Sequence, residues 1–174
     1  EICQVPRPSK KEEKMIAYLK AFGAKHNLET KVDEAGNVLI KKPATPGKEN
    51  LQTVVLQSHI DMVCEKNNDV QHDFLTDPIE TEIDGEWLKA KGTTLGADNG
   101  IGVATELAIL ADDSIEHGPL ECLFTVDEET GLTGAFALKE GFMSGDILLN
   151  LDSEDEGEIF IGCAGGIDSV AEFT

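Results

Sequence analysis

Three apolar segments, each followed closely by acidic residues or by histidine, constrain the fold of this 174-residue chain more than any other feature. They are TVVLQSHI (53–60), PLECLFTV (119–126) and DILLNL (146–151). Short runs of this kind, rich in Val, Ile and Leu, are typical of strands buried in a sheet. A helical pattern over residues 99–111 separates the first two runs. This alternation predicts an α/β fold, with helices on the faces of the sheet.

The rest of the chain supplies shorter elements. Apolar residues at helical spacing predict an amphipathic helix over residues 10–22, and Ser9 followed by Glu12 matches a capping box at its start. The other predicted elements are a hairpin of residues 28–33 and 37–42, strands at 85–91 and 157–163, an irregular segment at 62–80 and a short helix at 131–139.

Composition argues against several classes of protein. The formal net charge of −20 repels phosphate backbones, so nucleic acid is not an expected partner. No apolar run approaches the roughly 18 residues of a transmembrane helix, so no membrane partner is expected either. The four cysteines are far apart and form no Cys-x-x-Cys pair, which argues against a thiolate zinc site and against a disulfide framework. Reduced thiols fit a cytoplasmic protein.

Polar residues gather where the predicted strands end. In open α/β sheets, ligands bind beyond the carboxyl ends of the strands, so side chains that follow different strands can meet there. The loop KGTTLGADNGIG adds Asp98, which lies at the start of the predicted helix. Its glycines and asparagine relax the steric limits on the backbone, so the loop is interpreted as holding Asp98 in place. The candidate residues at this edge are His59, Asp61, Asp98, Asp127, Glu128, Glu129 and Asp152.

Such a cluster of carboxylates favours a metal site. Neighbouring carboxylates repel one another and raise their own pKa values, so a compact cluster is stable at neutral pH if it holds cations. One imidazole with several carboxylates suits zinc or a similar divalent ion, and a carboxylate such as Asp98 can bridge two ions. Asp61 could orient the imidazole of His59 from the same face of the chain. Of the pair Glu128 and Glu129, one could bind metal while the other accepts a proton from water.

Two other interpretations have weaker support. Gly100 and Gly102 begin a dinucleotide-binding pattern, but Thr105 occupies the place of its third glycine. Cys163 as a nucleophile has no histidine near it in the sequence.

The segments LQSHIDMV, GTTLGADNGIG, DEETGLTGA and NLDSEDEGEIFIGCAGG resemble the aminoacyl-histidine dipeptidases, also called Xaa-His or β-alanyl-histidine dipeptidases. These belong to a group of di-zinc exopeptidases that includes carnosinases and glutamate carboxypeptidases. The resemblance implies a three-layer sandwich with a mostly parallel mixed sheet. Residues 1–166 would be the N-terminal part of the catalytic domain, and residues 167–174 would begin the connection to a lid and dimerisation domain. The full-length protein would then be a cytoplasmic homodimer.

The resemblance also implies roles for individual residues. His59, Asp98 and Asp152 would bind one zinc ion. Asp98 would bridge to a second zinc ion that Glu129 also binds, and Glu128 would be the general base that activates the bridging water. Mn²⁺ or Co²⁺ could replace Zn²⁺.

Two further details follow from the same resemblance. Asp61 would support His59, and the peptide bond between Asp98 and Asn99 would be cis. The family's second zinc site takes a further histidine, and no residue of this chain matches it. The other histidines of the chain are not expected to be ligands; they are His26, His72 and His117.

The expected function is metal-dependent hydrolysis of dipeptides of the Xaa-His type. Because the second metal site is incomplete, the 174-residue chain alone is expected to be inactive. Two alternatives stay open. One is a related di-zinc amidohydrolase that acts on N-acyl amino acids, and the other is a metal-binding fragment without catalytic activity.

Overall fold

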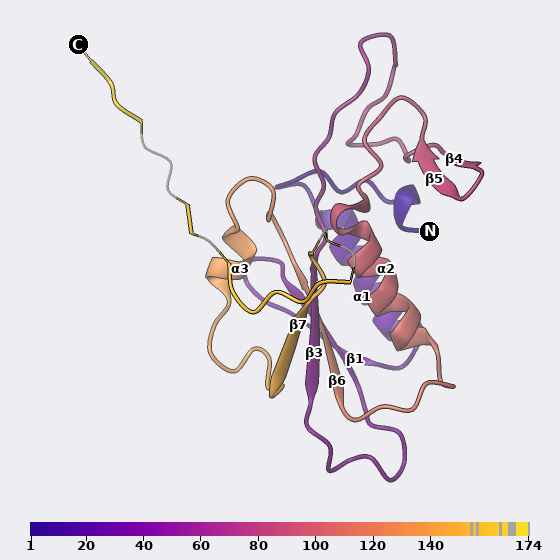
Figure 1. Ribbon diagram of the computed structural model, residues 1–174, viewed down its shortest axis with the longest axis vertical. Helices are drawn as coiled ribbons and strands as arrows, with labels where there is room; N and C mark the ends of the chain where they lie inside the picture. Colours follow the sequence, from indigo (N-terminus) through magenta and orange to yellow (C-terminus); the bar gives the residue numbers. More distant parts are fainter. Residues whose placement is uncertain (154, 156, 164, 167–169, 174) are drawn as a thin grey trace.

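In a computed structural model of the chain, one mixed sheet lies between two long helices and a short third helix (Figure 1). The structure describes residues 1–153, 155, 157–163, 165–166 and 170–173. The helices are α1 (Glu13–Lys25), α2 (Ala97–Ala111) and α3 (Thr133–Ala137), with a 3₁₀ helix at Ile2–Gln4. The strands are β1 (Glu29–Val32), β2 (Val38–Lys42), β3 (Val54–His59), β4 (Thr81–Asp84), β5 (Trp87–Ala90), β6 (Leu120–Thr125) and β7 (Ile147–Asn150). Within these residues, no helix combines the length and the hydropathy needed to cross a membrane.

The main sheet has the strand order β1-β2-β6-β3-β7, and its last three strands are parallel. His59 pairs with Thr125, and Gln57 pairs with Asn150, so the carboxyl ends of these three strands reach the same edge. The hairpin of β1 and β2 adds two antiparallel strands. A second sheet contains only β4 and β5. The predicted α/β fold with a mixed sheet is therefore confirmed.

The core has one layer on each side of the sheet. Alternate residues of β3 point to opposite faces, so Leu56 packs in the larger cluster, against α1 and α2, and Val55 packs in the smaller one, near α3. The larger cluster also includes Met15, Ile40, Leu110 and Phe124, and the smaller one contains Leu39 and Leu123. The three predicted layers are present, and they hold the ends of β3, β6 and β7 in fixed positions.

The predicted capping box is wrong. Helix α1 begins at Glu13, and Glu12 makes no side-chain capping bond to it. The Glu12 carboxylate accepts hydrogen bonds from the backbone N–H groups of Lys10 and Asp127 instead, at 2.9 and 3.0 Å. The Ser9 hydroxyl donates to Asp61 at 2.7 Å. Buried partners distant in sequence have displaced the local cap.

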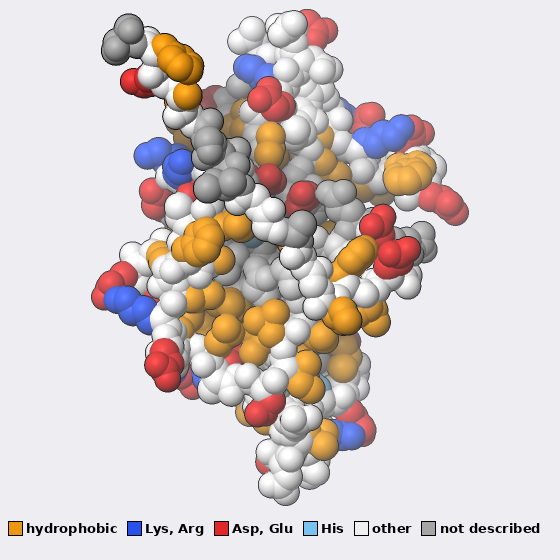
Figure 2. Space-filling model, turned by 60° about the vertical axis from the view of Figure 1, so that its left-hand side comes forward, with side chains coloured by type: hydrophobic (Ala, Val, Ile, Leu, Met, Phe, Trp, Pro, Cys, Tyr) orange, Lys and Arg blue, Asp and Glu red, His pale blue; other side chains and the backbone are white. Residues whose placement is uncertain are grey.

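Two expectations for the C-terminal part are also wrong. Residues 157–163 form no strand, and Ile159 and Ile161 are fully exposed. The run DILLNL does form β7, but its residues are exposed because β7 is the edge strand of the described sheet. An apolar run predicts burial only where another element covers it. Hydrophobic side chains accordingly show on the side of the molecule that Figure 2 brings forward. The predicted boundary at residues 167–174 falls partly outside the described residues.

Glu106 is an acid in the core without a cation beside it in the described part of the chain. It lies on α2 and is completely buried, and its nearest polar neighbours are the uncharged Ser58 hydroxyl and Cys122 thiol. Burial raises the pKa of Glu106 well above its ordinary value. Folding therefore favours the protonated acid, so its stabilising contribution is full at acid pH and is lost as pH rises through the raised pKa.

We expect Glu106→Gln to become more stable than the natural chain as pH rises, by about 1–3 kcal/mol at pH 8. The difference should disappear near pH 4, where both side chains are uncharged. Urea unfolding at a series of pH values measures it.

Glu121→Gln is the matched control. Glu121 is also buried, but its carboxylate accepts hydrogen bonds from Lys41 and Ser144, at 2.5 and 2.6 Å. Burial would raise the pKa of Glu121, yet these contacts outweigh it and lower the pKa. Its glutamine variant should lose stability at neutral pH and approach the natural chain at acid pH. The same pH trend in both variants would contradict this account.

Candidate metal centre

Six of the seven candidate residues meet at the carboxyl edge of the parallel strands, and the seventh, Asp127, lies deeper. His59 is the last residue of β3, Glu128 and Glu129 lie in the loop after β6, and Asp152 follows β7. Asp98 lies in the first turn of α2, and Asp61 follows β3 by two residues. Three parallel strands and one helix start thus deliver side chains from distant parts of the sequence to one place.

The His59 imidazole lies at the centre of this cluster. Its Nε2 atom is 2.9 Å from Asp98 Oδ1, 3.6 Å from Asp152 Oδ1 and 4.0 Å from Glu128 Oε2. Its Nδ1 atom is 3.2 Å from Asp61 Oδ1. The ring is almost completely buried, so both nitrogens are committed to these carboxylates.

Asp61 connects the cluster to the surrounding chain. Its carboxylate is fully buried and accepts hydrogen bonds from the Ser9 hydroxyl at 2.7 Å and from the N–H groups of Glu128 and Glu129 at 3.0 and 3.2 Å. Burial would raise the pKa of Asp61, but the bonds from His59, Glu128 and Ser9 outweigh it and hold the pKa at about 2. One ionised carboxylate therefore fixes both the imidazole and the backbone of the glutamate pair.

The negative charges of the cluster favour the binding of a cation. Burial would lower the pKa of His59, but the hydrogen bonds to Asp61 and Asp98 and the charge of Asp152 raise it to about 9. Burial is the largest effect that raises the pKa values of Glu128 and Glu129, and neighbouring carboxylates raise them further. A proton on His59 therefore offsets part of the negative charge, and a divalent cation would take the place of that proton.

Two sets of ligand atoms in the described residues have the spacing of a metal site. The first is His59, Asp98 and Asp152, and the second is His59, Glu128 and Glu129, each with its atoms within 4.8 Å of one another. One imidazole nitrogen with carboxylate oxygens is a donor set that suits zinc. The donor chemistry of the first set fits the ion that the resemblance implies there.

A third group of carboxylates lies deeper and is already satisfied. It contains Glu12, Asp61 and Asp127. Asp127 has a positive φ of 51°, and its carboxylate accepts hydrogen bonds from the hydroxyls of Thr130 and Thr133. Asp127 therefore shapes the turn that presents the glutamate pair.

Asn99 joins the end of β7 to the start of α2 through its side chain, a role that the sequence did not predict. Its side-chain N–H₂ group donates to the Leu151 carbonyl oxygen at 3.0 Å and to the Asp152 carboxylate. The peptide bond between Asp98 and Asn99 is cis, as the resemblance implied. The position of Asn99 directly after Asp98 was the available signal. No sequence signal indicated the contact of Ser9 with Asp61, because the spacing of Ser9 to Glu12 matched a helix cap.

The other three histidines lie in contacts of their own. His26 stacks near Phe22 with ring centroids 4.4 Å apart, and His72 meets Phe74 edge-on at 4.5 Å. His117 Nδ1 lies 2.7 Å from a backbone carbonyl oxygen. None of the three belongs to a group of potential metal ligands in the described residues.

We expect Asp61→Asn to destabilise the chain by about 2 kcal/mol or more, because the amide cannot accept all the bonds that the ionised carboxylate accepts. Chemical unfolding measures the loss. Asp112→Asn is the control, since Asp112 accepts a backbone N–H at 2.7 Å but is exposed. Equal losses in the two variants would contradict the role given to Asp61.

Comparisons with known proteins agree with this geometry. The cytosol non-specific dipeptidase of Escherichia coli is 56% identical over 168 residues, which cover 97% of this chain and 35% of that protein. The crystal structure of aminoacylhistidine dipeptidase from Vibrio alginolyticus matches with a TM-score of 0.90 and 59% identity, over 93% of this chain and 33% of that one.

A more distant structure, aminopeptidase PepT from Bacillus cereus, matches with a TM-score of 0.74 and 27% identity, over 88% of this chain and 41% of that one. The chain thus spans about a third of the length of the first two relatives. The sequence profile described as "Peptidase family M20/M25/M40" matches residues 55–170. That segment includes His59, Asp98, Glu128 and Asp152, and with the 56% identity it shows that this chain belongs to peptidase family M20/M25/M40.

Proposed function

We propose that this chain supplies the metal-binding edge of a dipeptidase that hydrolyses dipeptides of the Xaa-His type with the help of two zinc ions. The observation that carries the proposal is the position of His59 Nε2, within 4.0 Å of carboxylates that come from three separate segments. The names of the E. coli and V. alginolyticus relatives support the dipeptide substrate.

Each residue has a distinct task in this proposal. His59, Asp98 and Asp152 hold one ion, and Asp98 with Glu129 holds part of the site for the second. Mn²⁺ or Co²⁺ would fit the same donors. Metal ions held by these residues would supply Lewis-acid chemistry, polarising the scissile carbonyl group and lowering the pKa of water.

In this proposal Glu128 is the general base. Its carboxylate reaches within 4.0 Å of His59 Nε2, and its backbone N–H is held by Asp61. Burial raises the pKa of Glu128, which makes it a stronger base than an exposed carboxylate. It would take a proton from the attacking water and deliver it to the leaving amine.

A cavity beside the cluster has room for a small peptide. Its volume is about 760 Å³, and Glu128 and Asp152 lie on its wall. Leu123 and Met143 contribute apolar surface, and Gln57 contributes an amide. A dipeptide bound there would place its peptide bond next to the glutamate.

The remaining proposals concern the whole protein. The E. coli relative is named a cytosol enzyme, and we propose the same location here. Homodimerisation through a lid domain that begins near residues 167–174 stays a prediction. So does the inactivity of the 174-residue chain by itself, which a dipeptidase assay of the purified chain with added zinc would test.

In the natural protein that carries this chain, we expect Glu128→Gln to reduce kcat about 10²- to 10⁴-fold while zinc content stays unchanged, because only proton transfer is lost. Asp98→Asn should lose both activity and zinc. Hydrolysis of a Xaa-His dipeptide and metal analysis after dialysis are the two measurements.

Glu116→Gln is the control, since Glu116 is an exposed acid whose carboxylate pairs with Lys48. It should behave like the natural protein. Full activity in Glu128→Gln would refute the assigned base. Turnover of N-acyl amino acids in preference to dipeptides would instead support the related amidohydrolase.

A further inference from the structure

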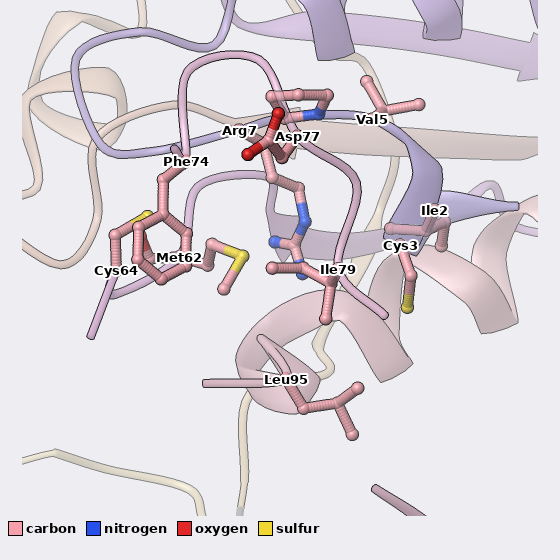
Figure 3. A pocket seen from close by; sticks show the side chains of 11 residues that line it. Ile2, Cys3, Val5, Arg7, Met62, Cys64, Phe74, Asp77, Ile79 and Leu95 are labelled. Carbon is pink, nitrogen blue, oxygen red and sulfur yellow. The ribbon is translucent and has the colours of Figure 1, made fainter. Parts of the chain in front are cut away.

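Arg7 is a buried cation that contacts backbone segments next to the candidate metal centre. It lies before α1, and only 3% of its surface is exposed. Its Nη1 atom donates to the carbonyl oxygens of Ile60 and Asp61 at 3.0 and 2.9 Å, and its Nη2 atom donates to the carbonyl oxygen of Gly96. Figure 3 shows the side chain extending toward the start of α2, beside Met62 and Ile79.

These contacts join the two chain segments that carry the central pair of the site. Ile60 and Asp61 directly follow His59, and Gly96 precedes Asp98 by two residues. The distance between His59 Nε2 and Asp98 Oδ1 therefore depends on how these two backbones are held together. A guanidinium is well suited to that task, because its donors have a rigid planar geometry that a lysine ammonium lacks.

Burying the guanidinium of Arg7 carries a desolvation cost. Removing a charge from water costs several kcal/mol even in real proteins, and the side-chain hydrogen bonds of Arg7 described here go only to backbone carbonyls. Burial accordingly lowers the pKa of Arg7, while the negative charges of Asp61 and Asp98 raise it.

Two glycines of the loop leave the space that this guanidinium occupies. A Cβ atom at Gly96 would lie 2.5 Å from Arg7 Nη2, and one at Gly100 would lie 2.8 Å from it. Gly96 also has a φ of 70°, which only glycine adopts without strain. Gly100 has no such backbone requirement, so Arg7 is the reason that a side chain is not accommodated there.

We propose that Arg7 is a positioning residue that sets the geometry of His59 and Asp98 for metal binding. This inference rests on the proposed function, and it assigns to Arg7 no contact with metal or substrate. It also gives a reason for the glycines on both sides of Asp98.

The test measures metal affinity in the natural protein after metal has been removed. Arg7→Met and Arg7→Lys should each weaken the first Zn²⁺ or Co²⁺ binding event about 10- to 100-fold by calorimetry, the range typical of groups that support metal ligands. The absorption spectrum of the Co²⁺ form should change as well, because the ligand geometry shifts. Gly100→Ala should show the same effects, although alanine favours a helix more than glycine does.

Lys42→Met is the matched control. Lys42 is also a buried cation, and its Nζ donates to the carbonyl oxygens of Ile109 and Asp112 at the far end of α2, at 3.1 and 2.8 Å. It should lose thermal stability as Arg7→Met does, but it should keep its metal affinity and its Co²⁺ spectrum.

Normal affinity and spectrum in Arg7→Lys and Gly100→Ala would overturn the proposal, even if Arg7→Met fails to fold. His59→Ala distinguishes a failure of the metal-site proposal from a failure of the Arg7 proposal. If that variant keeps full metal affinity, the proposed metal site itself is wrong. If metal affinity falls only in His59→Ala, the metal site stands and Arg7 has no part in positioning its ligands.

Discussion

The candidate site depends on the buried carboxylate of Asp61. It accepts hydrogen bonds from Ser9, Glu128 and Glu129 and contacts the imidazole of His59. It therefore ties the N-terminal segment, the end of β3 and the loop after β6 to one pair of oxygens. A buried carboxylate of this kind is stable because each of its oxygens has donors. Its charge in turn keeps His59 oriented and favours a cation on the other side of the ring.

The parallel strands explain why acids from distant parts of the sequence meet there. The carboxyl ends of β3, β6 and β7 lie at one edge, and the start of α2 packs over them. Asn99 then holds Asp152 to α2, and in our proposal Arg7 holds Gly96 to the end of β3. Burial raises the pKa values of Glu128 and Glu129, and neighbouring carboxylates raise them further, so positive charge in the cluster would be favourable. The fold thus supplies candidate ligands and an electrostatic reason for binding an ion.

Much of this could be predicted from the sequence, because strand burial and strand ends leave strong patterns. The β6 run PLECLFTV and the hairpin of β1 and β2 were predicted correctly, as was the meeting of His59 with Asp98 and Asp152. The predictions that failed concerned features that depend on contacts between distant segments. The pair Ser9 and Glu12 carries a local capping pattern, yet both side chains turn to residues more than 50 positions away. Arg7 went unnoticed because three backbone carbonyls leave no pattern in a sequence. The exposure of β7 depends on which elements pack against it, and the apolar residues of the strand do not reveal those elements.

The most direct test of the central claim is anomalous diffraction at the zinc absorption edge from crystals grown with Zn²⁺. The account predicts a peak about 2.0–2.2 Å from His59 Nε2 and from carboxylate oxygens of Asp98 and Asp152. Zinc found only at surface carboxylates, with His59 still bonded to Asp98 and no ion between them, would contradict it.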